Sequence, residues 1–176
     1  MHRVAISDLD KKAIANLCIG AIFFCMRSCE YTKVSQQEDR KTKLLCLRNI
    51  CFFKNNQLIQ HDSTQLSSAL LISITFEDQK NREKNQAINL HRSRDDVLCP
   101  VRSWCKTVKR IWSYQGASRD FPVNLFQLEG KSLRITNTNI LRALRSTVES
   151  MQERFNLGFT SEEIGTHSIR SGEQCC

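Results

Sequence analysis

The stretch ALLISITFED, residues 69–78, decides the architecture, because it has the pattern of a strand in a chain that otherwise favours helices. Within it, Ile72, Ile74 and Phe76 alternate with smaller polar residues. A period of two places the three large apolar side chains on one face of a sheet. A half-buried strand of this kind predicts partner strands nearby in the sequence.

Two neighbouring stretches supply those partners. Residues 44–53, LLCLRNICFF, are rich in β-branched and aromatic side chains, and residues 86–91, QAINLH, form a short third candidate. The connection DQKNREKN at 78–85 is strongly charged, as a turn at a sheet end would be. We therefore predict a small three-stranded antiparallel sheet.

Helical periodicity governs most of the remaining chain. Residues 7–31 predict a first helix, capped by Ser7 or Asp8 and apolar almost all the way round. Pro100 suits the first turn of a helix that runs to about Tyr114. Its predicted inward face consists of Val101, Trp104, Cys105, Val108 and Ile111.

Two more helices are predicted in the last quarter of the chain, after a loop at 117–133. Thr136 or Thr138 begins a long helix that Gly158 ends. Thr160 and Glu163 form a capping box for the last helix. The predicted inward side chains of the long helix are Ile140, Leu141, Leu144, Val148, Met151 and Phe155.

The whole chain, residues 1–176, is the length of one domain. The fold class is mainly α with a small three-stranded antiparallel sheet (α+β). The apolar run at 13–26 is shorter than the roughly 20 residues that span a bilayer. It predicts a core helix, and no membrane partner is expected.

The charge balance favours an anionic partner. Lys and Arg number 26 against 18 Asp and Glu, a formal net charge of +8 with a pI near 9.2. Such an excess is typical of proteins that bind nucleic acid, although an ordinary basic domain is equally compatible with it.

The nine cysteines show no metal-binding spacing. No C-x-x-C pair occurs, so we expect neither a zinc site nor a disulfide framework. Cys18, Cys25, Cys46 and Cys51 lie in apolar runs and predict buried free thiols. Thiols of this kind indicate a reducing compartment, nuclear or cytoplasmic.

Four cationic or imidazole side chains stand out as candidates for chemistry. Arg27 ends the first apolar helix and has Glu30 three residues on, either as a structural ion pair or as a group that aims Arg27 at an anion. His167 and Arg170 share one face of the last predicted helix and suit a phosphate. Lys80, with Lys84 as an alternative, lies in the charged turn, where a solvated lysine is the simpler interpretation.

Taken together, these positions resemble the catalytic domain of the tyrosine recombinases, the phage-integrase-like enzymes of mobile elements. The segment AIFFCMRSCEY matches that family's first arginine box, GTHSIRSG matches its H-x-x-R box, and LCPVRSW matches the start of its helix after the sheet. The resemblance covers about residues 5–172.

The resemblance implies strand transfer on double-stranded DNA through a phosphotyrosine, with no metal and no other cofactor, and a homo-oligomer could form on the DNA. By this resemblance, Arg27 and Arg170 hold the phosphate oxygens, His167 contacts the phosphate and Lys80 protonates the leaving oxygen. Glu30 supports Arg27.

The chain departs from the family pattern at the nucleophile. Its two tyrosines, Tyr31 and Tyr114, do not match the nucleophile's place in the family, and the family's N-terminal core-binding domain has no counterpart before residue 7. We therefore expect a partial catalytic core that does not cleave DNA alone. A non-catalytic basic module that binds DNA or protein is the alternative, and a basic helical domain unrelated to DNA is a third.

Overall fold

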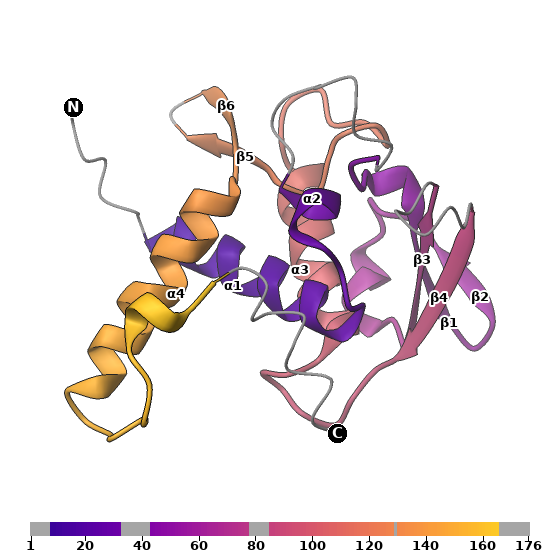
Figure 1. Ribbon diagram of the computed structural model, residues 1–176. Coiled ribbons are helices and arrows are strands. Elements are labelled where there is room, and N and C mark those ends of the chain that lie inside the picture. The colour runs from indigo at the N-terminus through magenta and orange to yellow at the C-terminus, as the bar shows by residue number, and fades with distance from the viewer. Residues whose placement is uncertain (1–7, 33–42, 78–84, 129, 166–176) are drawn as a thin grey trace.

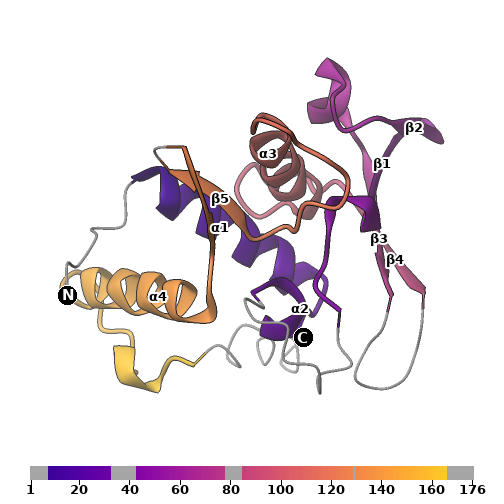
Figure 2. The ribbon, with the colours of Figure 1, turned by 90° about the horizontal axis from the view of Figure 1, so that it is seen from above.

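The computed structural model describes residues 8–32, 43–77, 85–128 and 130–165. It is a mixed α and β fold in which helices and sheet form successive layers (Figures 1 and 2). The four-stranded sheet lies at one side, helices α1 (Asp8–Phe23) and α3 (Pro100–Trp112) occupy the middle, and α4 (Asn137–Gln152) lies beyond them. The α+β class predicted from the sequence is confirmed.

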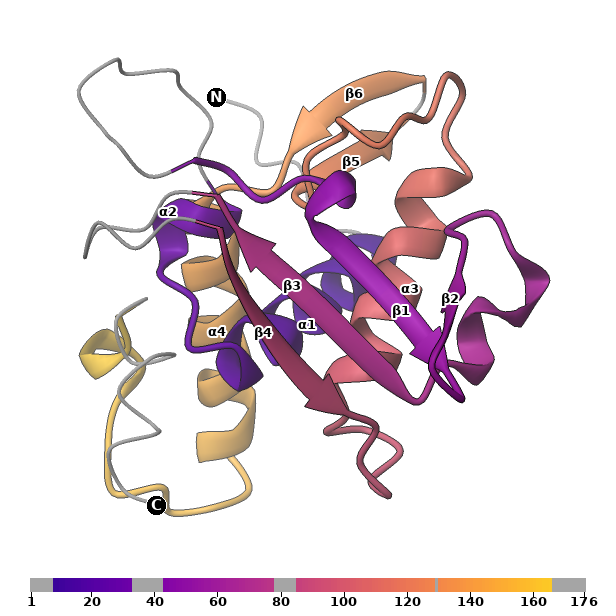
Figure 3. The ribbon, with the colours of Figure 1, turned by 90° about the vertical axis from the view of Figure 1, so that its right-hand side faces the viewer.

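The sheet is fully antiparallel in the order β2-β1-β3-β4 (Figure 3). Its strands are β1 (Ile50–Lys54), β2 (Gln57–Ile59), β3 (Leu71–Phe76) and β4 (Gln86–His91). Ile72, Ile74 and Phe76 are buried as their alternation predicted. The register pairs Ile74 with Ile50 and Ile72 with Phe52, which gives the inner face a continuous apolar surface.

The prediction of three strands was wrong, because β2 adds an edge strand. The connection from β1 is a two-residue turn, Asn55-Asn56, with φ of 52° and 62°. Positive φ at both central residues is the geometry of a tight hairpin whose twist matches the strands, and asparagine adopts it more readily than most residues. The first strand is also shorter than predicted, since a 3-10 turn, η1 (Leu47–Asn49), precedes it.

The single helix predicted at 7–31 is in fact two. Helix α1 ends at Phe23, and Cys25 turns left-handed with φ of 50°. The amides of Cys25 and Met26 then donate to the carbonyls of Ile22 and Ala21, at 3.0 Å each, which is the Schellman pattern of a helix end. Buried Met26 secures this turn, and the four-residue helix α2 (Ser28–Tyr31) follows in a new direction.

Helix α3 is central to the core, and its predicted inward face is confirmed. Val101, Trp104, Cys105, Val108 and Ile111 are all buried. The helix packs against the sheet on one side and against α1 on the other. No helix within the described ranges is long and apolar enough to cross a membrane.

The region predicted as a loop at 117–133 contains a second sheet. Strands β5 (Leu125–Leu128) and β6 (Lys131–Arg134) pair antiparallel. The hairpin is held against α3 by Arg110, whose Nη1 donates to the Leu125 carbonyl at 2.6 Å. Because the adjacent residues Leu125 and Phe126 are both buried, apolar and polar residues do not alternate along β5, and the sequence pattern of a strand is weak there.

Helix α4 begins at the predicted cap, but the apolar side chains toward and beyond its C-terminal end are less buried than predicted. Thr136 caps it, accepting from the Asn139 amide at 3.2 Å while the Asn139 side chain accepts from the Thr136 amide at 2.9 Å. Ile140 is buried, but Met151 and Phe155 are 42% and 60% exposed, against the prediction that both point inward. Nothing in the described part of the chain covers that end of the apolar stripe.

The last predicted helix is a single 3-10 turn, η3 (Ser161–Glu163), in the described residues. The predicted capping contact is present, with the Thr160 amide donating to the Glu163 carboxylate at 2.6 Å. Ile164 is already extended, with φ of −82° and ψ of 119°. The prediction of a continuous helix from Thr160 was therefore wrong.

The seven cysteines of the described residues are free thiols. Cys18 and Cys46 are buried as predicted, Cys51 is half-buried and Cys25 is exposed, which corrects that part of the prediction. Cys25 faces solvent because it occupies the left-handed position that ends α1. Burial raises the pKa of the Cys18 thiol to about 12, so this group is an unreactive core residue.

His61 is a buried histidine, 5% exposed, between the rings of Phe52 and Trp112. Its Nε2 lies 2.8 Å from the Ile50 carbonyl. Since a carbonyl only accepts, Nε2 carries the proton and Nδ1 is left without a hydrogen-bond partner in the described structure. Burial lowers the pKa of the imidazole, and Arg119 adds to that effect, against the Ile50 carbonyl and Asp62, which raise it.

We expect His61 to make the protein less stable in mild acid. Its folded pKa lies below the usual value near 6.5, so the unfolded chain binds more protons and stability falls as pH drops below that value. The slope should approach at most about 1.4 kcal/mol per pH unit. Urea denaturation of the wild type and of His61→Gln between pH 7.5 and 5.5 measures it. An equally steep slope in His61→Gln would contradict the assignment.

Candidate functional site

Arg27 occupies the N-cap position of α2, with φ of −76° and ψ of 144°. The Glu30 carboxylate accepts a hydrogen bond from the Arg27 main-chain amide at 2.7 Å. Glu30 is 5% exposed, whereas the arginine is half-buried. Glu30 thus fixes the backbone at Arg27.

Helix α2 is attached to the segment that leads into the sheet. The Leu45 amide donates to the Glu30 carbonyl at 2.8 Å, and the Val123 amide donates to the Leu45 carbonyl at 3.1 Å. Residues 43–46 therefore run between α2 and the β5–β6 region. The Lys43 ammonium, 3.3 Å from the Glu77 carboxylate, then ties this segment to the end of β3.

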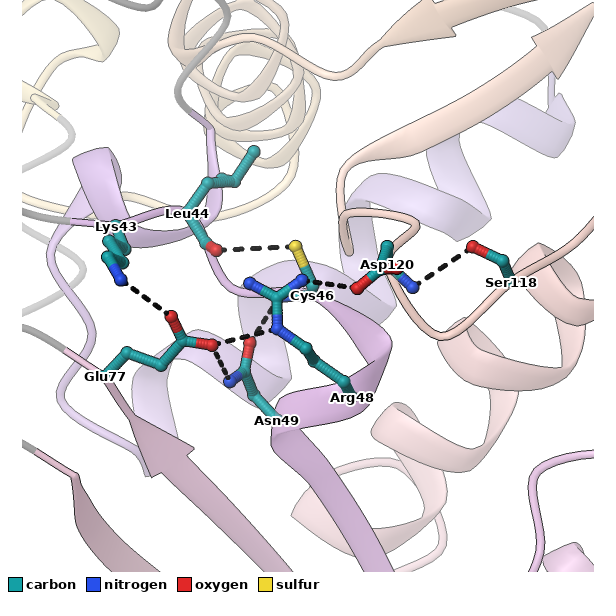
Figure 4. A network of polar contacts seen from close by, with 8 residues as sticks. All are labelled: Lys43, Leu44, Cys46, Arg48, Asn49, Glu77, Ser118 and Asp120. Carbon is teal, nitrogen blue, oxygen red and sulfur yellow. Dashed lines mark hydrogen bonds and ion pairs between the residues drawn. The ribbon is translucent and has the colours of Figure 1, made fainter. Parts of the chain in front are cut away.

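A polar network holds that end of the sheet (Figure 4). Glu77 directly follows β3 and accepts from Arg48 Nε at 2.9 Å and from Asn49 Nδ2 at 2.8 Å. The Lys43 ammonium lies 3.3 Å from its other oxygen, and Arg48 Nη1 reaches Asp120 at 2.6 Å. The Asn49 amide and then the Arg48 guanidinium lower the pKa of Glu77 to about 2, so it is ionised at neutral pH.

This network is a structural support and not a reactive site. Arg48 gains two carboxylate partners, Glu77 and Asp120, and its pKa rises mainly through those hydrogen bonds. Its side chain is 43% exposed, so the ion pairs are screened by solvent and contribute modestly to stability. Their effect is geometric, because they tie the end of β3 to the segment that follows α2 and to the loop that precedes β5.

Lys80, the alternative Lys84, His167 and Arg170 all lie outside the described residues. The structure does describe the frame around the first two. Phe76 pairs with Gln86, so the charged turn leaves the sheet between Glu77 and Asn85. Residues 43–45, which contact both Glu30 and Glu77, link α2 to the base of that turn, and the convergence of Arg27 with Arg170 stays a prediction.

Neither tyrosine is presented as a nucleophile. Tyr31 is 1% exposed, and burial raises the pKa of its hydroxyl further above its ordinary value. The Tyr114 hydroxyl accepts a hydrogen bond from Arg110 Nη1 at 2.7 Å, and the same guanidinium lies 5.9 Å from the Tyr114 ring centre. Both side chains are used in packing.

No cluster of three or more His, Cys, Asp or Glu side chains that could hold a metal ion occurs in the part of the chain that the structure describes. Cys99, at the N-cap of α3, differs from Cys18, Cys46 and Cys105 in that its pKa falls. Burial alone would raise it, but the Arg102 amide and the groups of Ser93 stabilise the thiolate more strongly. It is completely buried, which keeps it from reacting with solutes.

Sequence reasoning missed Arg48, Asn49, Glu77 and Asp120. The first three could have been found from their positions in the sequence. Polar residues just before one strand and just after its antiparallel neighbour lie at the same end of the sheet. Asp120 carries no such signal, because it lies 72 residues from Arg48 in the sequence.

No protein-family model, curated protein or solved structure matches this chain. Its assignment therefore depends on the residues and on the geometry of the described part.

Proposed function

We propose that this protein binds double-stranded DNA through the end of the sheet that is linked to α2 and its N-cap Arg27, and that it is a tyrosine recombinase-type catalytic core. The observation that carries the proposal is the anchoring of α2 beside the base of the β3–β4 turn. In this arrangement α2, which Arg27 caps, is held through residues 43–45 to the end of the sheet from which the turn that bears Lys80 leaves. A net charge of +8 supplies attraction to the DNA backbone.

In the proposed site, the chain's cations bind the scissile phosphate. Arg27 offers a planar fork of donors to two non-bridging oxygens, and Glu30 keeps the arginine's backbone in place. Arg170 and His167 are proposed to bind the same phosphate from the C-terminal region, and Lys80 to protonate the leaving oxygen. Stabilising the charge that develops on the phosphate is the largest contribution such a site makes.

A DNA-binding module that does not cleave is the second candidate, and the tyrosines favour it. Tyr31 is enclosed in the core and Tyr114 is held by Arg110. Strand cleavage would then need a nucleophile other than these two tyrosines. The two candidates share the phosphate-binding step and differ only in whether a strand is cleaved after binding.

Orthovanadate, which mimics the transition state of phosphoryl transfer, tests the shared step. We expect Arg27→Ala to weaken its binding about tenfold or more, equivalent to about 1.4 kcal/mol. Arg27→Lys should recover part of the loss, since it keeps the charge and removes the fork. Arg142→Ala, an exposed arginine on α4, is the matched control and should bind as the wild type does.

A double-variant cycle tests whether two arginines share one phosphate. Residues that contact one ligand group give non-additive losses, whereas independent sites give additive ones. Arg27→Ala combined with Arg170→Ala should therefore cost clearly less than the sum of the single changes. Additive losses, or vanadate binding that Arg27→Ala leaves unchanged, would remove the recombinase-type site. Circular dichroism of each variant verifies the fold.

A further inference from the structure

Three cations converge on a short turn at the opposite end of the sheet from Arg27. The turn is η2 (Thr64–Ser68). Lys109 Nζ donates to Ser67 Oγ at 2.7 Å, and Lys54 Nζ lies 3.4 Å from Ser68 Oγ. Arg92 Nη1 donates to the carbonyls of Ser67 and Ala69, at 2.9 and 3.2 Å. We call Lys54, Arg92 and Lys109 the cationic cluster.

The cluster is assembled by the fold from three separate elements. Lys54 ends β1, Arg92 directly follows β4 and Lys109 lies in the last turn of α3. Backbone bonds lock their frame together, since the Leu70 amide donates to the Phe53 carbonyl at 2.9 Å and the Arg92 amide donates to the Leu70 carbonyl at 2.8 Å. In Figure 3 this is the end toward which the β1 and β4 arrows point.

The positive charge of the cluster is not neutralised by protein. Among the described residues, no carboxylate pairs with Lys54, Arg92 or Lys109, and their acceptors are neutral hydroxyls and carbonyls. The electrostatic field of the cluster reaches the buried Cys105, whose thiol lies 3.1 Å from the Leu66 carbonyl. Burial raises the pKa of that thiol to about 12, against Arg92 and Lys109, which lower it.

The cluster also has unused donors and open access. An ammonium has three N–H donors and a guanidinium has five, more than the contacts with the turn consume. Lys54, Ser67 and Lys109 are exposed. A hollow of about 420 Å³ lies on the β2 side of Lys54 and is lined also by Ser63 and Gln65, so the Lys54 side of the cluster is open.

We propose that the cationic cluster is a phosphate-binding site, with the hydroxyl of Ser67 completing its donors, since the Ser68 hydroxyl already donates to the Gln65 carbonyl at 2.8 Å. Three cations and one hydroxyl around one accessible turn suit a tetrahedral oxyanion that accepts several hydrogen bonds. The phosphate can be free or part of a DNA backbone, and the DNA source rests on the proposed function. β3 spans roughly 20 Å between the two sheet ends, about six phosphate spacings on one strand. One duplex could therefore contact both ends.

The DNA arm measures how duplex affinity depends on salt. Lys54→Gln combined with Lys109→Gln keeps both side-chain stems and removes two charges. Each lost phosphate contact lowers the slope of log K against log salt by about 0.9, so this variant should lose about 1.8. Lys12→Gln combined with Lys131→Gln removes the same charge from exposed positions on α1 and β6 and should leave the slope near that of the wild type. Arg92 is left intact because it holds the turn.

The second arm uses inorganic phosphate alone. Phosphate should raise the melting temperature of the wild type and of the control variant equally, and should raise that of the Lys54/Lys109 variant clearly less, since any phosphate bound at the Arg27 site stabilises all three proteins alike. If phosphate stabilises in this way but duplex does not bind, the site stands with free phosphate as its ligand and the proposed function fails. If duplex binds and both arms treat the cluster variant and its control alike, the proposed function stands and the cluster is overturned. If phosphate stabilises no variant and duplex does not bind, both the cationic cluster and the proposed function are overturned.

Discussion

Gly20→Ala is expected to destabilise the protein by about 1–3 kcal/mol, the cost of forcing a methyl group into a close-packed core. The informative result is whether the substitution lowers or raises the free energy of unfolding. In an ordinary helix interior the same change stabilises by about 1 kcal/mol, because alanine has the higher helix propensity. Gly20 lies within α1 and has no left-handed backbone angle to preserve.

The reason lies in the crossing of α1 and α3. A Cβ at position 20 would lie 2.6 Å from both Cε2 and Nε1 of Trp104, and 3.1 Å from Cζ2. Trp104 is completely buried, so its ring has no free space into which to move. Glycine at this position lets the α1 backbone rest directly on the indole.

Urea denaturation of three variants checks this. Gly20→Ala should lower the denaturation midpoint, and Ala15→Gly, at an exposed position of the same helix, should show only the propensity cost of about 1 kcal/mol. In a Trp104→Phe background the smaller ring should reduce the cost of Gly20→Ala, a non-additivity expected of residues in contact. Trp104 Nε1 has no acceptor in the described residues, so Trp104→Phe breaks no hydrogen bond. Stabilisation by Gly20→Ala would show that the helices separate easily.

Asn124→Ala is expected to cost about 1–3 kcal/mol, because it leaves the carbonyl of the buried Ile135 without its side-chain partner. Asn124 is completely buried where the chain enters β5. Its Nδ2 donates to the Ile135 carbonyl at 3.0 Å, and its Oδ1 accepts from Arg134 Nη1 at 3.2 Å. The backbone adds a third link, with the Ile135 amide donating to the Asn124 carbonyl at 2.8 Å.

This side chain joins the core to the start of α4, since Ile135 directly precedes the Thr136 cap. Loss of the link should therefore affect α4 before the sheet. Hydrogen exchange of the amides of α4 should accelerate in Asn124→Ala more than that of β3, together with the fall in denaturation midpoint. The exposed Asn137→Ala, at the first turn of α4, should change stability by less than about 0.5 kcal/mol. Equal acceleration of both elements would place Asn124 in the global core and not at a joint.

The sequence by itself determined the regular central elements. The inward faces of α3 and β3, the Thr136 cap and the extent of β4 were all predictable, because each depends on spacing within a few residues of one element. It also singled out Arg27 and Glu30, whose contact spans three residues.

Only the tertiary structure decided where α1 stops, that β2 and the β5–β6 hairpin exist, and which charges meet. Helix α1 ends where buried Met26 and left-handed Cys25 complete its cap, in a run whose apolar character continues unchanged. Arg48 meets Glu77 across 29 residues and Asp120 across 72, and Lys109 meets Ser67 across 42. Local periodicity encodes which face of an element is apolar, but contacts of that length depend on how the packed layers bring distant elements together.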